Sequence, residues 1–527
     1  MNTENYIYYP VKKFIERYKA QKNIRLHMPG HKGAFNYGDD ITEIKGADSL
    51  YEANGIIADS ERKTAEMFGA ANSFYSTEGS SQVIKAMCFL AVQRFYSLHG
   101  SAASVGEMAG NQNDKPDGAI IRPTILATRN AHKSFIYASM LLGFNIKWLM
   151  DGEEFSLCKC NITADGLNRK LQDMEVADVA AVYVTSPDYL GNILDVKELA
   201  EVAHKYGLPL LVDNAHGSYL KFMKKDLHPV SLGADIVADS AHKTLPVMTG
   251  GAYLHVSKES LFLKMNNGQY VTNGQVIGLI SEDFSAEIRK ALLMFGSTSP
   301  SYVIMESMDE ALGRIDVGEY RKTQDRVETL KHELSKMGYN ILGLGSEMNE
   351  PLKVVIDLNS YGKGEDGKNG GNEVVSGERF RAQISGEQLS DMLRNHGIEC
   401  EYADPDFLVT MWSPYNEYPA DFDSFKNAME DIMNHVGNEL EAAKEKDFGK
   451  IHLEGYSLPK VKYQPYEIMY RPHYREKVGP NLIGKIAADT SVSCPPAVSP
   501  IVAGEVIDEN SIKVLQYYGI ESVEVLR

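Results

Sequence analysis

The segment from Val179 to Val256 decides the fold, because it holds several short apolar runs that are separated by turn-forming residues. Such β-branched runs are too short for helices and predict buried strands. Asp195 can cap a helix between the first two, Gly207 can end it, and a further helical stretch is expected before the third. Strand, helix and strand in this order predict a right-handed parallel unit, whose ligands bind at the carboxyl ends of the strands. The runs read VAAVYV at 179–184, LPLLV at 208–212, DIVAD at 235–239 and GGAYLHV at 250–256.

Asp213 and Lys243 follow two of these strands and are candidates for chemistry. Asp213 ends the strand at 208–212, and Lys243 comes just after the strand at 235–239. A lysine amine can hold an aldehyde cofactor as a Schiff base, and a buried carboxylate can keep a pyridine nitrogen protonated. The pair therefore suggests a pyridoxal phosphate site. On spacing alone, a capping aspartate and a surface lysine explain the two residues about as well.

Several motifs, in their order along the chain, resemble the ornithine/lysine/arginine decarboxylases of the aspartate-aminotransferase fold. Together they are far more specific than any one of them. The resemblance implies an α/β fold, with a large pyridoxal phosphate domain around a mostly parallel sheet, a smaller α/β domain and a small C-terminal domain. The short stretch before Leu26 resembles the shorter biosynthetic members of the family, which lack an additional regulatory domain. The motifs are Leu26 to Gly33, Tyr75 to Ser81, Arg129 to Ser134, Val212 to Gly217, Ser240 to Thr244, Thr298 to Tyr302, and Pro495-Pro496 through Gly504-Glu505.

Lys243 is preferred over Lys32 and Lys133 as the lysine that holds the cofactor. Lys32 lies in a Pro/Gly-rich arm before any predicted strand, and Lys133 opens a helix upstream of Asp213. Lys243 follows the strand after Asp213 and precedes a Gly-Gly strand, which is also the place of the cofactor lysine in the family. For the other two lysines we expect exposed or phosphate-directed charge.

The phosphate of the cofactor needs backbone N–H groups and hydroxyls near the start of a helix. Gly79-Ser80-Ser81 opens a predicted helix that continues from Gln82. By itself such a tripeptide is usually an N-cap. The resemblance adds Ser240, His242 and Thr298 as cofactor contacts, with Thr298 reaching the phosphate of a neighbouring subunit.

His132 and His216 are also expected at the cofactor. His132 follows an apolar strand at 125–128 and precedes a helix, and in the family this histidine stacks on the cofactor ring. An imidazole there would fix the ring and could hand a proton to the substrate. Without the family pattern, His132 would be interpreted as a loop histidine bonded to backbone. His216, three residues after Asp213, is given a supporting role.

The reaction that the resemblance implies is loss of the α-carboxylate from a basic amino acid, with arginine ahead of lysine and ornithine and the amine feeding polyamine synthesis. Lys243 or His132 would return a proton to the α-carbon. A cationic substrate side chain needs a carboxylate, for which Glu505 is the candidate, with Asp188 behind it. For both acids, simple solvation is an equally good interpretation.

Two other functions stay open. A fold-related aminotransferase or carbon-sulfur lyase would use the same cofactor, but an aminotransferase needs a second keto acid substrate. Release of carbon dioxide without a keto acid separates the two. A catalytically idle, cofactor-binding regulatory protein is the other alternative. Intact Asp213, His132 and Lys243 count against it, because an idle protein has no chemical need for all three.

The composition agrees with a large enzyme. The chain has 527 residues, of which 43% are apolar, and a formal net charge of -18. This charge argues against nucleic acid and anionic membrane surfaces as partners. The five cysteines show no metal-ligand spacing, so we expect no metal, and they fit a reducing cytoplasm. We expect neither a signal peptide nor a membrane span.

The predicted parts of the chain are an N-terminal helix and arm (1–35), the large domain (36–313), the small domain (314–448) and a linker with the C-terminal domain (449–527). Because this fold usually builds its site between two subunits, we expect at least a homodimer. Polar tracts at 99–118 and 361–377 are expected to be loops. Periodicity predicts helices at 11–20, 320–337 and 385–396 and a strand at 352–358.

Overall fold

A seven-stranded sheet with the order β1-β7-β6-β5-β4-β2-β3 forms the centre of the molecule. The computed structural model describes residues 9–99, 122–151, 156–263, 284–358, 384–442, 457–488 and 498–527, with three short strands between 265 and 279. In the central sheet only β7 runs against its neighbours, so the predicted mostly parallel α/β fold is confirmed. Its strands are β1 (Asn72–Ser76), β2 (Thr124–Thr128), β3 (Asn145–Leu149), β4 (Val179–Thr185), β5 (Leu210–Asp213), β6 (Ile236–Asp239) and β7 (Ala252–Val256).

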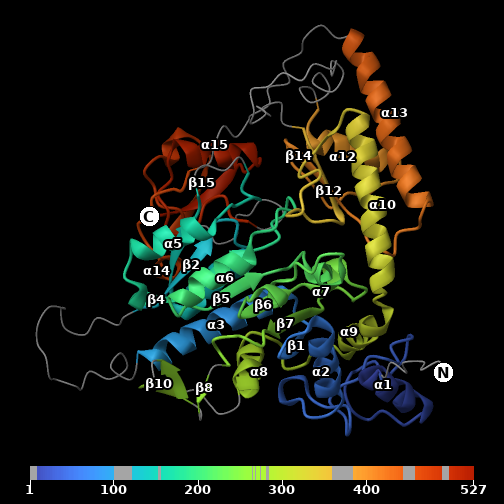
Figure 1. Ribbon diagram of the computed structural model, residues 1–527, viewed down its shortest axis with the longest axis vertical. Helices are drawn as coiled ribbons and strands as arrows, with labels where there is room; N and C mark the ends of the chain where they lie inside the picture. Colours follow the sequence, from blue (N-terminus) through green and yellow to red (C-terminus); the bar gives the residue numbers. More distant parts are fainter. Residues whose placement is uncertain are drawn as a thin grey trace, which may run out of the picture.

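Helices cover both faces of this sheet (Figure 1), because its strands are apolar on both sides. Val182 and Val184 of β4 pack with α5 and α6, whereas Ala181 and Tyr183 point to the opposite face and pack with α3 and α4. This alternation is the period of two that a pleated strand imposes. The covering helices are α3 (Ser80–Leu98), α4 (Lys133–Leu142), α5 (Ala164–Gln172), α6 (Val196–Lys205) and α8 (Phe284–Met294).

The local signals of the sequence explain most of this arrangement. The Asp195 carboxylate accepts from the Glu198 N–H at 3.0 Å and so caps α6, and Gly207 follows that helix with φ of +73°. The connection from β5 to β6 differs from the expectation. It contains two short 3-10 helices, η4 (Ser218–Phe222) and η5 (Pro229–Leu232), in place of a longer helix. Proline has no N–H to continue a helical ladder into η5.

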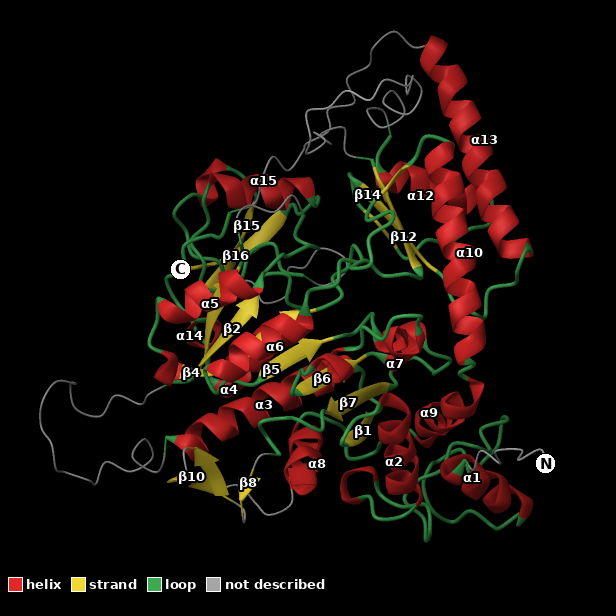
Figure 2. Ribbon diagram, viewed as in Figure 1, coloured by secondary structure: helices red, strands yellow, loops and turns green. Residues whose placement is uncertain are grey.

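A second sheet of four antiparallel strands, in the order β11-β12-β14-β13, packs with α10, α12 and α13 (Figure 2). The predicted helices and strand of this region are confirmed within a few residues. Ser385 and Gln388 form a capping box at the start of α12. The elements are α10 (Val317–Lys336), β11 (Asn340–Ile341), β12 (Lys353–Asp357), α12 (Gly386–Asn395), β13 (Tyr402–Ala403), β14 (Phe407–Met411) and α13 (Ala420–Ala442).

The C-terminal residues form a small unit in which two antiparallel strands pack with α15. Its elements are α14 (Pro465–Ile468), β15 (His473–Lys477), η6 (Pro480–Leu482), α15 (Glu509–Tyr517) and β16 (Ser522–Leu526). The remaining elements are α1 (Pro10–Ala20), η1 (Leu50–Glu52), α2 (Ile56–Phe68), η3 (Val176–Asp178), α7 (Ala241–Thr244), β8 (Met265–Asn266), β9 (Gln269–Thr272), β10 (Gln275–Leu279) and α9 (Tyr302–Arg314).

One apolar core connects the N-terminal helix, the large sheet and the small sheet. Val11 of α1, Ile57 of α2, Val327 of α10 and Val354 of β12 are fully buried members of this core. The predicted domain boundaries stay predictions. The loops predicted at 99–118, apart from His99, and at 361–377 lie outside the described residues. Among the helices that the structure describes, none is both long and apolar enough to cross a membrane.

Candidate active site

Asp213 and Lys243 meet at the carboxyl edge of the central sheet. Asp213 is the last residue of β5, and its register partner in the parallel strand β6 is Ala238. Lys243 lies in the four-residue helix α7, which begins directly after β6 and Ser240. Because β5 and β6 are parallel, both side chains start from the same edge of the sheet. The structure therefore brings the two predicted residues together.

The Asp213 carboxylate is buried, with 1% of the residue exposed. It accepts hydrogen bonds from Tyr183 Oη at 3.1 Å and from the Ala215 N–H at 3.2 Å. Burial raises the pKa of Asp213 to about 6, although the nearby Lys243 ammonium opposes this shift. At neutral pH the Asp213 carboxylate is therefore mostly ionised and can pair with a cationic group.

Lys243 lines a pocket and is accessible to solvent. Its Nζ lies 2.9 Å from His216 Nε2. Burial lowers the pKa of Lys243, and it lowers the pKa of the buried His216 well below the ordinary value. His216 is therefore neutral at pH 7. Its Nδ1 is buried without a hydrogen-bond partner among the described residues.

Four serines lie at the beginning of α3. Gly79 has φ of +70° and precedes this 19-residue helix. Ser240 Oγ donates to Ser80 Oγ at 2.6 Å, and Ser134 Oγ donates to Ser81 Oγ at 2.9 Å. Hydroxyls and orphan N–H groups at a helix start form an anion site.

His132 lies beside these serines as the N-cap of α4. Its Nδ1 accepts from the Ser134 N–H at 3.1 Å, so its Nε2 holds the proton of the neutral ring. Burial and the charges of Lys243 and Lys133 lower the pKa of His132 to about 4. His132 is thus a neutral ring at pH 7.

His242 and Thr298 form no hydrogen bond with Lys243 among the described residues. His242 Nδ1 lies 3.0 Å from the Gly251 carbonyl oxygen, which fixes α7 against β7. Thr298 is exposed between α8 and α9. No contact within the described residues joins Thr298 to Lys243.

Glu505 and Asp188, the two carboxylates predicted for the substrate, have different surroundings. Glu505 is buried and accepts from Arg129 at 3.3 Å, Trp148 Nε1 at 3.2 Å and the Val502 N–H at 2.7 Å. Both of its oxygens are therefore used within the protein. Asp188 is also buried, and one oxygen accepts from the Asn192 N–H at 2.9 Å. Burial raises the pKa of Asp188 to about 7.

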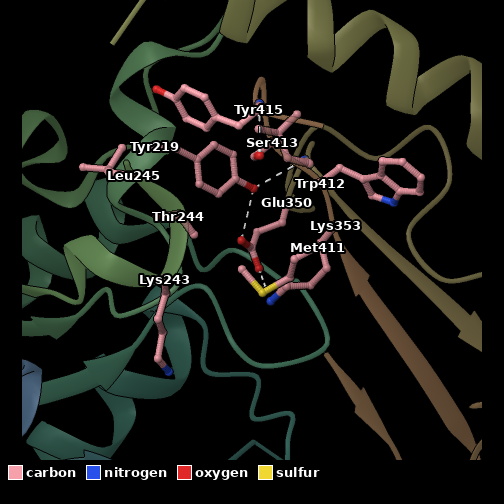
Figure 3. A pocket seen from close by; sticks show the side chains of 11 residues that line it. Tyr219, Lys243, Thr244, Leu245, Glu350, Lys353, Met411, Trp412, Ser413 and Tyr415 are labelled. Carbon is pink, nitrogen blue, oxygen red and sulfur yellow. Dashed lines mark hydrogen bonds and ion pairs between the residues drawn. The ribbon is translucent and has the colours of Figure 1, made fainter. Parts of the chain in front are cut away.

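A pocket of about 180 Å³ opens beside Lys243, between η4, the β11–β12 connection and the end of β14. Figure 3 shows Glu350 between Tyr219 and Lys353 in this pocket. Tyr219 Oη donates to Glu350 Oε1 at 3.1 Å, and Lys353 forms an ion pair with the other oxygen. These residues were not predicted from the sequence. Their signal is weak, because Glu350 and Lys353 stand only as an acid and a base around Pro351 at the start of a strand.

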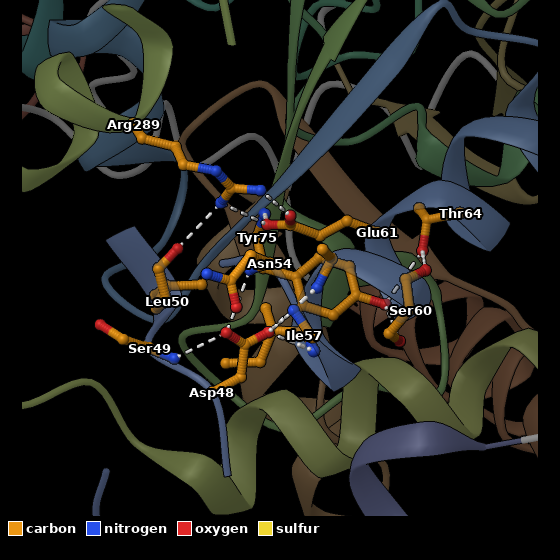
Figure 4. A network of polar contacts seen from close by, with 12 residues as sticks. Asp48, Ser49, Leu50, Asn54, Ile57, Ser60, Glu61, Thr64, Tyr75 and Arg289 are labelled. Carbon is orange, nitrogen blue, oxygen red and sulfur yellow. Dashed lines mark hydrogen bonds and ion pairs between the residues drawn. The ribbon is translucent and has the colours of Figure 1, made fainter. Parts of the chain in front are cut away.

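A polar network around Asp48 fixes the loop that leads into α2 (Figure 4). The Asp48 carboxylate accepts from the N–H groups of Asn54, Gly55 and Ile57 at 2.8 to 3.1 Å, and so holds the start of α2. In the same loop, Tyr51 Oη accepts from Gln82 Nε2 at 3.1 Å. The loop is thereby anchored to the helix that begins with Ser80.

Asp239, the last residue of β6, is the centre of a second buried network beside the site. His228 Nε2 lies 2.9 Å and His255 Nε2 3.4 Å from Asp239 Oδ2, and Asn214 Nδ2 donates to Oδ1 at 2.7 Å. Burial opposes ionisation of Asp239, but the two histidines outweigh it and hold its pKa below the ordinary range. Among the described residues, Asp239 and its two histidines are the group whose atoms are close enough to hold a metal. Their mutual contacts account for them without one, and the network fixes Asn214 next to Asp213.

The donor set fits pyridoxal phosphate. The hydroxyls of Ser80, Ser81 and Ser240 suit a phosphate, and the buried anion Asp213 suits a protonated pyridine nitrogen. The Lys243 amine suits an aldehyde. The unpartnered Nδ1 of His216 is a buried donor left for a ligand.

Comparisons with known proteins agree with this geometry. The family model "Orn/Lys/Arg decarboxylase, major domain" matches residues 9–340. The chain is 24% identical to an uncharacterized protein of Bacillus subtilis, YaaO, over 96% of this chain and 93% of that one. It is also 24% identical to an arginine decarboxylase of Bacillus subtilis, over 94% and 91% of the two chains.

Solved structures show the same fold. Lysine decarboxylase A from Pseudomonas aeruginosa superposes with a TM-score of 0.70 at 17% identity, covering 98% of this chain and 80% of that one. The constitutive lysine decarboxylase of E. coli superposes with a TM-score of 0.67 at 16% identity, covering 99% and 82%.

Proposed function

Because the chain belongs to the Orn/Lys/Arg decarboxylase family and is a pyridoxal-phosphate-dependent amino acid decarboxylase, we propose that it removes the α-carboxylate of a basic L-amino acid. Arginine is the favoured substrate, ahead of lysine and ornithine, and the amine would feed polyamine synthesis. The names of several Bacillus relatives, printed as arginine decarboxylases, support arginine. The net charge of -18 would attract a cationic substrate.

The proposal rests on one observation: Asp213 and Lys243 converge at the sheet edge with the hydroxyls of Ser80, Ser81 and Ser240. The cofactor, when bound, supplies an electron sink for the bond that breaks. Ser80, Ser81 and Ser240 would bind its phosphate at the start of α3. Asp213 would hold the ring nitrogen in its protonated form. Even with its pKa raised to about 6, Asp213 is mostly ionised at neutral pH, and its negative charge favours the protonated ring.

Lys243 would hold the cofactor and then serve as the acid that returns a proton to the α-carbon. Its lowered pKa brings proton transfer closer to neutral pH. His132 has a pKa of about 4 and is neutral, so it is better suited to cover the ring face than to protonate the substrate. His216, at 2.9 Å from Lys243 Nζ, would orient the amine. His242 would hold α7 in place.

A homodimer completes the proposal. Ile24, Leu26 and Phe35 of the N-terminal arm are 86%, 89% and 81% exposed, and a second copy of this chain would cover them. Thr298 is exposed as well and would reach the partner's cofactor phosphate. The chain has only five cysteines, without the density of a disulfide-stabilised protein, which supports a reducing, cytoplasmic location.

The test is to supply the purified holoenzyme separately with arginine, lysine, ornithine and a neutral amino acid such as norleucine, without any keto acid. Carbon dioxide and amine are measured in each reaction. We expect equal amounts of both from a basic amino acid, fastest with arginine. Turnover that requires a keto acid, or a preference for the neutral substrate, would contradict the proposal.

A further inference from the structure

Other carboxylates of the candidate site are less suited to a cation. Glu350 is neutralised by Lys353, and Glu505 by Arg129. Asp188 is buried, with 2% of the residue exposed, and burial raises its pKa to about 7, so it is only partly an anion at neutral pH. Asp213 is the partner proposed for the cofactor ring. A basic side chain entering the site would need another acid, because burying a cation without an anion is costly.

Glu401 is a further acid near Lys243, and its side chain is exposed. It precedes β13, and its N–H donates to the Val409 carbonyl at 3.0 Å, which fixes its backbone to β14. Tyr189 Oη donates to Glu401 Oε1 at 2.6 Å. Within the described residues, Glu401 forms no ion pair with a lysine, arginine or histidine.

Tyr189 connects Glu401 to the catalytic lysine. The Tyr189 ring meets the His216 ring edge-on, with centroids 4.8 Å apart, and His216 lies 2.9 Å from Lys243 Nζ. Two further contacts hold Tyr189 in place. Lys353 Nζ donates to the Tyr189 carbonyl at 3.2 Å, and the Tyr402 ring lies edge-on at 5.2 Å. Glu401 is therefore linked to Lys243 through Tyr189 and His216. It lines a pocket that shares Met411 and Trp412 with the pocket beside Lys243.

The electrostatics of Lys243 agree with this placement. Burial lowers the pKa of Lys243, and the two anions that oppose the shift most are Asp213 and then Glu401. The field of Glu401 thus reaches the reacting amine. A cationic substrate side chain that extends from Lys243 toward Glu401 moves into this field.

We propose that Glu401, held by Tyr189, binds the cationic end of the substrate side chain and so selects basic amino acids, an inference that rests on the proposed function. One carboxylate oxygen accepts from Tyr189, and the other is available to an ammonium or guanidinium group. This role differs from the one expected for Glu505, which stays a prediction. The alternative is that Glu401 only anchors Tyr189.

Glu401→Gln separates the two roles, because the amide keeps an acceptor for Tyr189 and loses the charge. Glu399→Gln is the matched control, since Glu399 is also exposed and lies two residues away, in an ion pair with Arg394. Tyr189→Phe is the second variant, which keeps the ring on His216 and loses the hydrogen bond. For each holoenzyme, KM and kcat are measured with a basic amino acid, and the dissociation constant of the corresponding amine by calorimetry.

We expect Glu401→Gln to raise both KM and the dissociation constant of the amine about ten- to a hundredfold, with kcat changed only a few-fold. Tyr189→Phe should raise both less, and Glu399→Gln should change neither. The inference is overturned if Glu401→Gln binds the amine as tightly as Glu399→Gln does. If the wild-type enzyme releases no carbon dioxide from any basic amino acid, the proposed function fails first, and this inference fails with it.

Discussion

At the scale of single residues, burial sets the ionisation of the site. The pKa values of Asp213, Lys243, His132 and His216 are all shifted in favour of the uncharged form, mainly because the surrounding protein reduces their solvation. For Asp213 and Lys243 the shift brings the pKa closer to neutral pH, which is typical of groups that exchange protons with a ligand.

Replacing Asp213 by asparagine tests the charge at the ring nitrogen. Asparagine keeps the size of the side chain but cannot stabilise a protonated ring. We expect Asp213→Asn to lose decarboxylation by about a hundredfold or more, while Lys243 still takes up the cofactor. Unchanged kcat in the asparagine variant would show that this carboxylate has no such role.

Asp188 provides a test by pH. The folded protein holds the Asp188 proton up to about pH 7, whereas the unfolded chain loses it near its ordinary pKa. The contribution of Asp188 to the free energy of unfolding is thus present at low pH and is lost as the pH rises through this interval. Asparagine at position 188 does not ionise, so the free energy of unfolding of Asp188→Asn does not fall in this way as the pH rises. We expect the variant to gain about 4 kcal/mol relative to wild type between pH 4 and pH 8, measured by urea unfolding, and a constant difference across this range would contradict the shift.

At the scale of elements, buried polar networks fix the segments that frame the site. Glu61 of α2 is buried and pairs with Arg289 of α8 at 2.6 Å, while Arg289 also donates to the Leu50 carbonyl at 2.9 Å. The same Glu61 accepts from the Tyr75 N–H at 2.9 Å. Helices α2 and α8 are thereby joined to β1, whose next turn leads to Ser80.

Removing Arg289 should therefore be costly. Arg289→Met leaves the Glu61 carboxylate buried without a cation, so we expect the free energy of unfolding to fall by about 3 to 5 kcal/mol. Adding Glu61→Gln in the same chain should restore part of this loss, because no charge then remains buried. Urea unfolding of the two single variants and the double variant measures the coupling energy between Arg289 and Glu61. If the changes in the free energy of unfolding simply add, the two residues are not coupled.

The sequence predicts those elements whose signals are local. The strands β4, β5 and β6 follow from apolar runs, α6 from its Asp195 cap, and Asp213 and Lys243 from their places after strands. The reversed direction of β7 has no local signal. Tyr219, Glu350 and Glu401 could not be found, because they come from connections without periodicity and meet only when the small sheet packs on the large one.

At the scale of the whole molecule, the site lies where three parts of the chain meet. The large sheet supplies Asp213 and Lys243, and the small sheet supplies Glu350 and its neighbours in the pocket. The C-terminal segment reaches the site through a β-bridge between His132 and Val498. Changes at these contacts would move the site without touching the cofactor residues.

The exposed arm predicts an assembly of at least two chains. Leu26→Ser combined with Phe35→Ser removes apolar surface that a second copy would bury, so we expect a weaker dimer and, with it, a lower kcat. Light scattering and activity measured over a range of protein concentrations report both. A wild-type protein that is fully active as a monomer would exclude the shared site.

The most direct test of the central claim is to identify the residue that binds the cofactor. The holoenzyme is reduced with borohydride, digested, and the peptide with the pyridoxyl group is sequenced by mass spectrometry. We predict the label on Lys243, and we predict that Lys243→Ala loses both the label and turnover. A label on Lys32 or Lys133, or a protein that never takes up pyridoxal phosphate, would contradict the account.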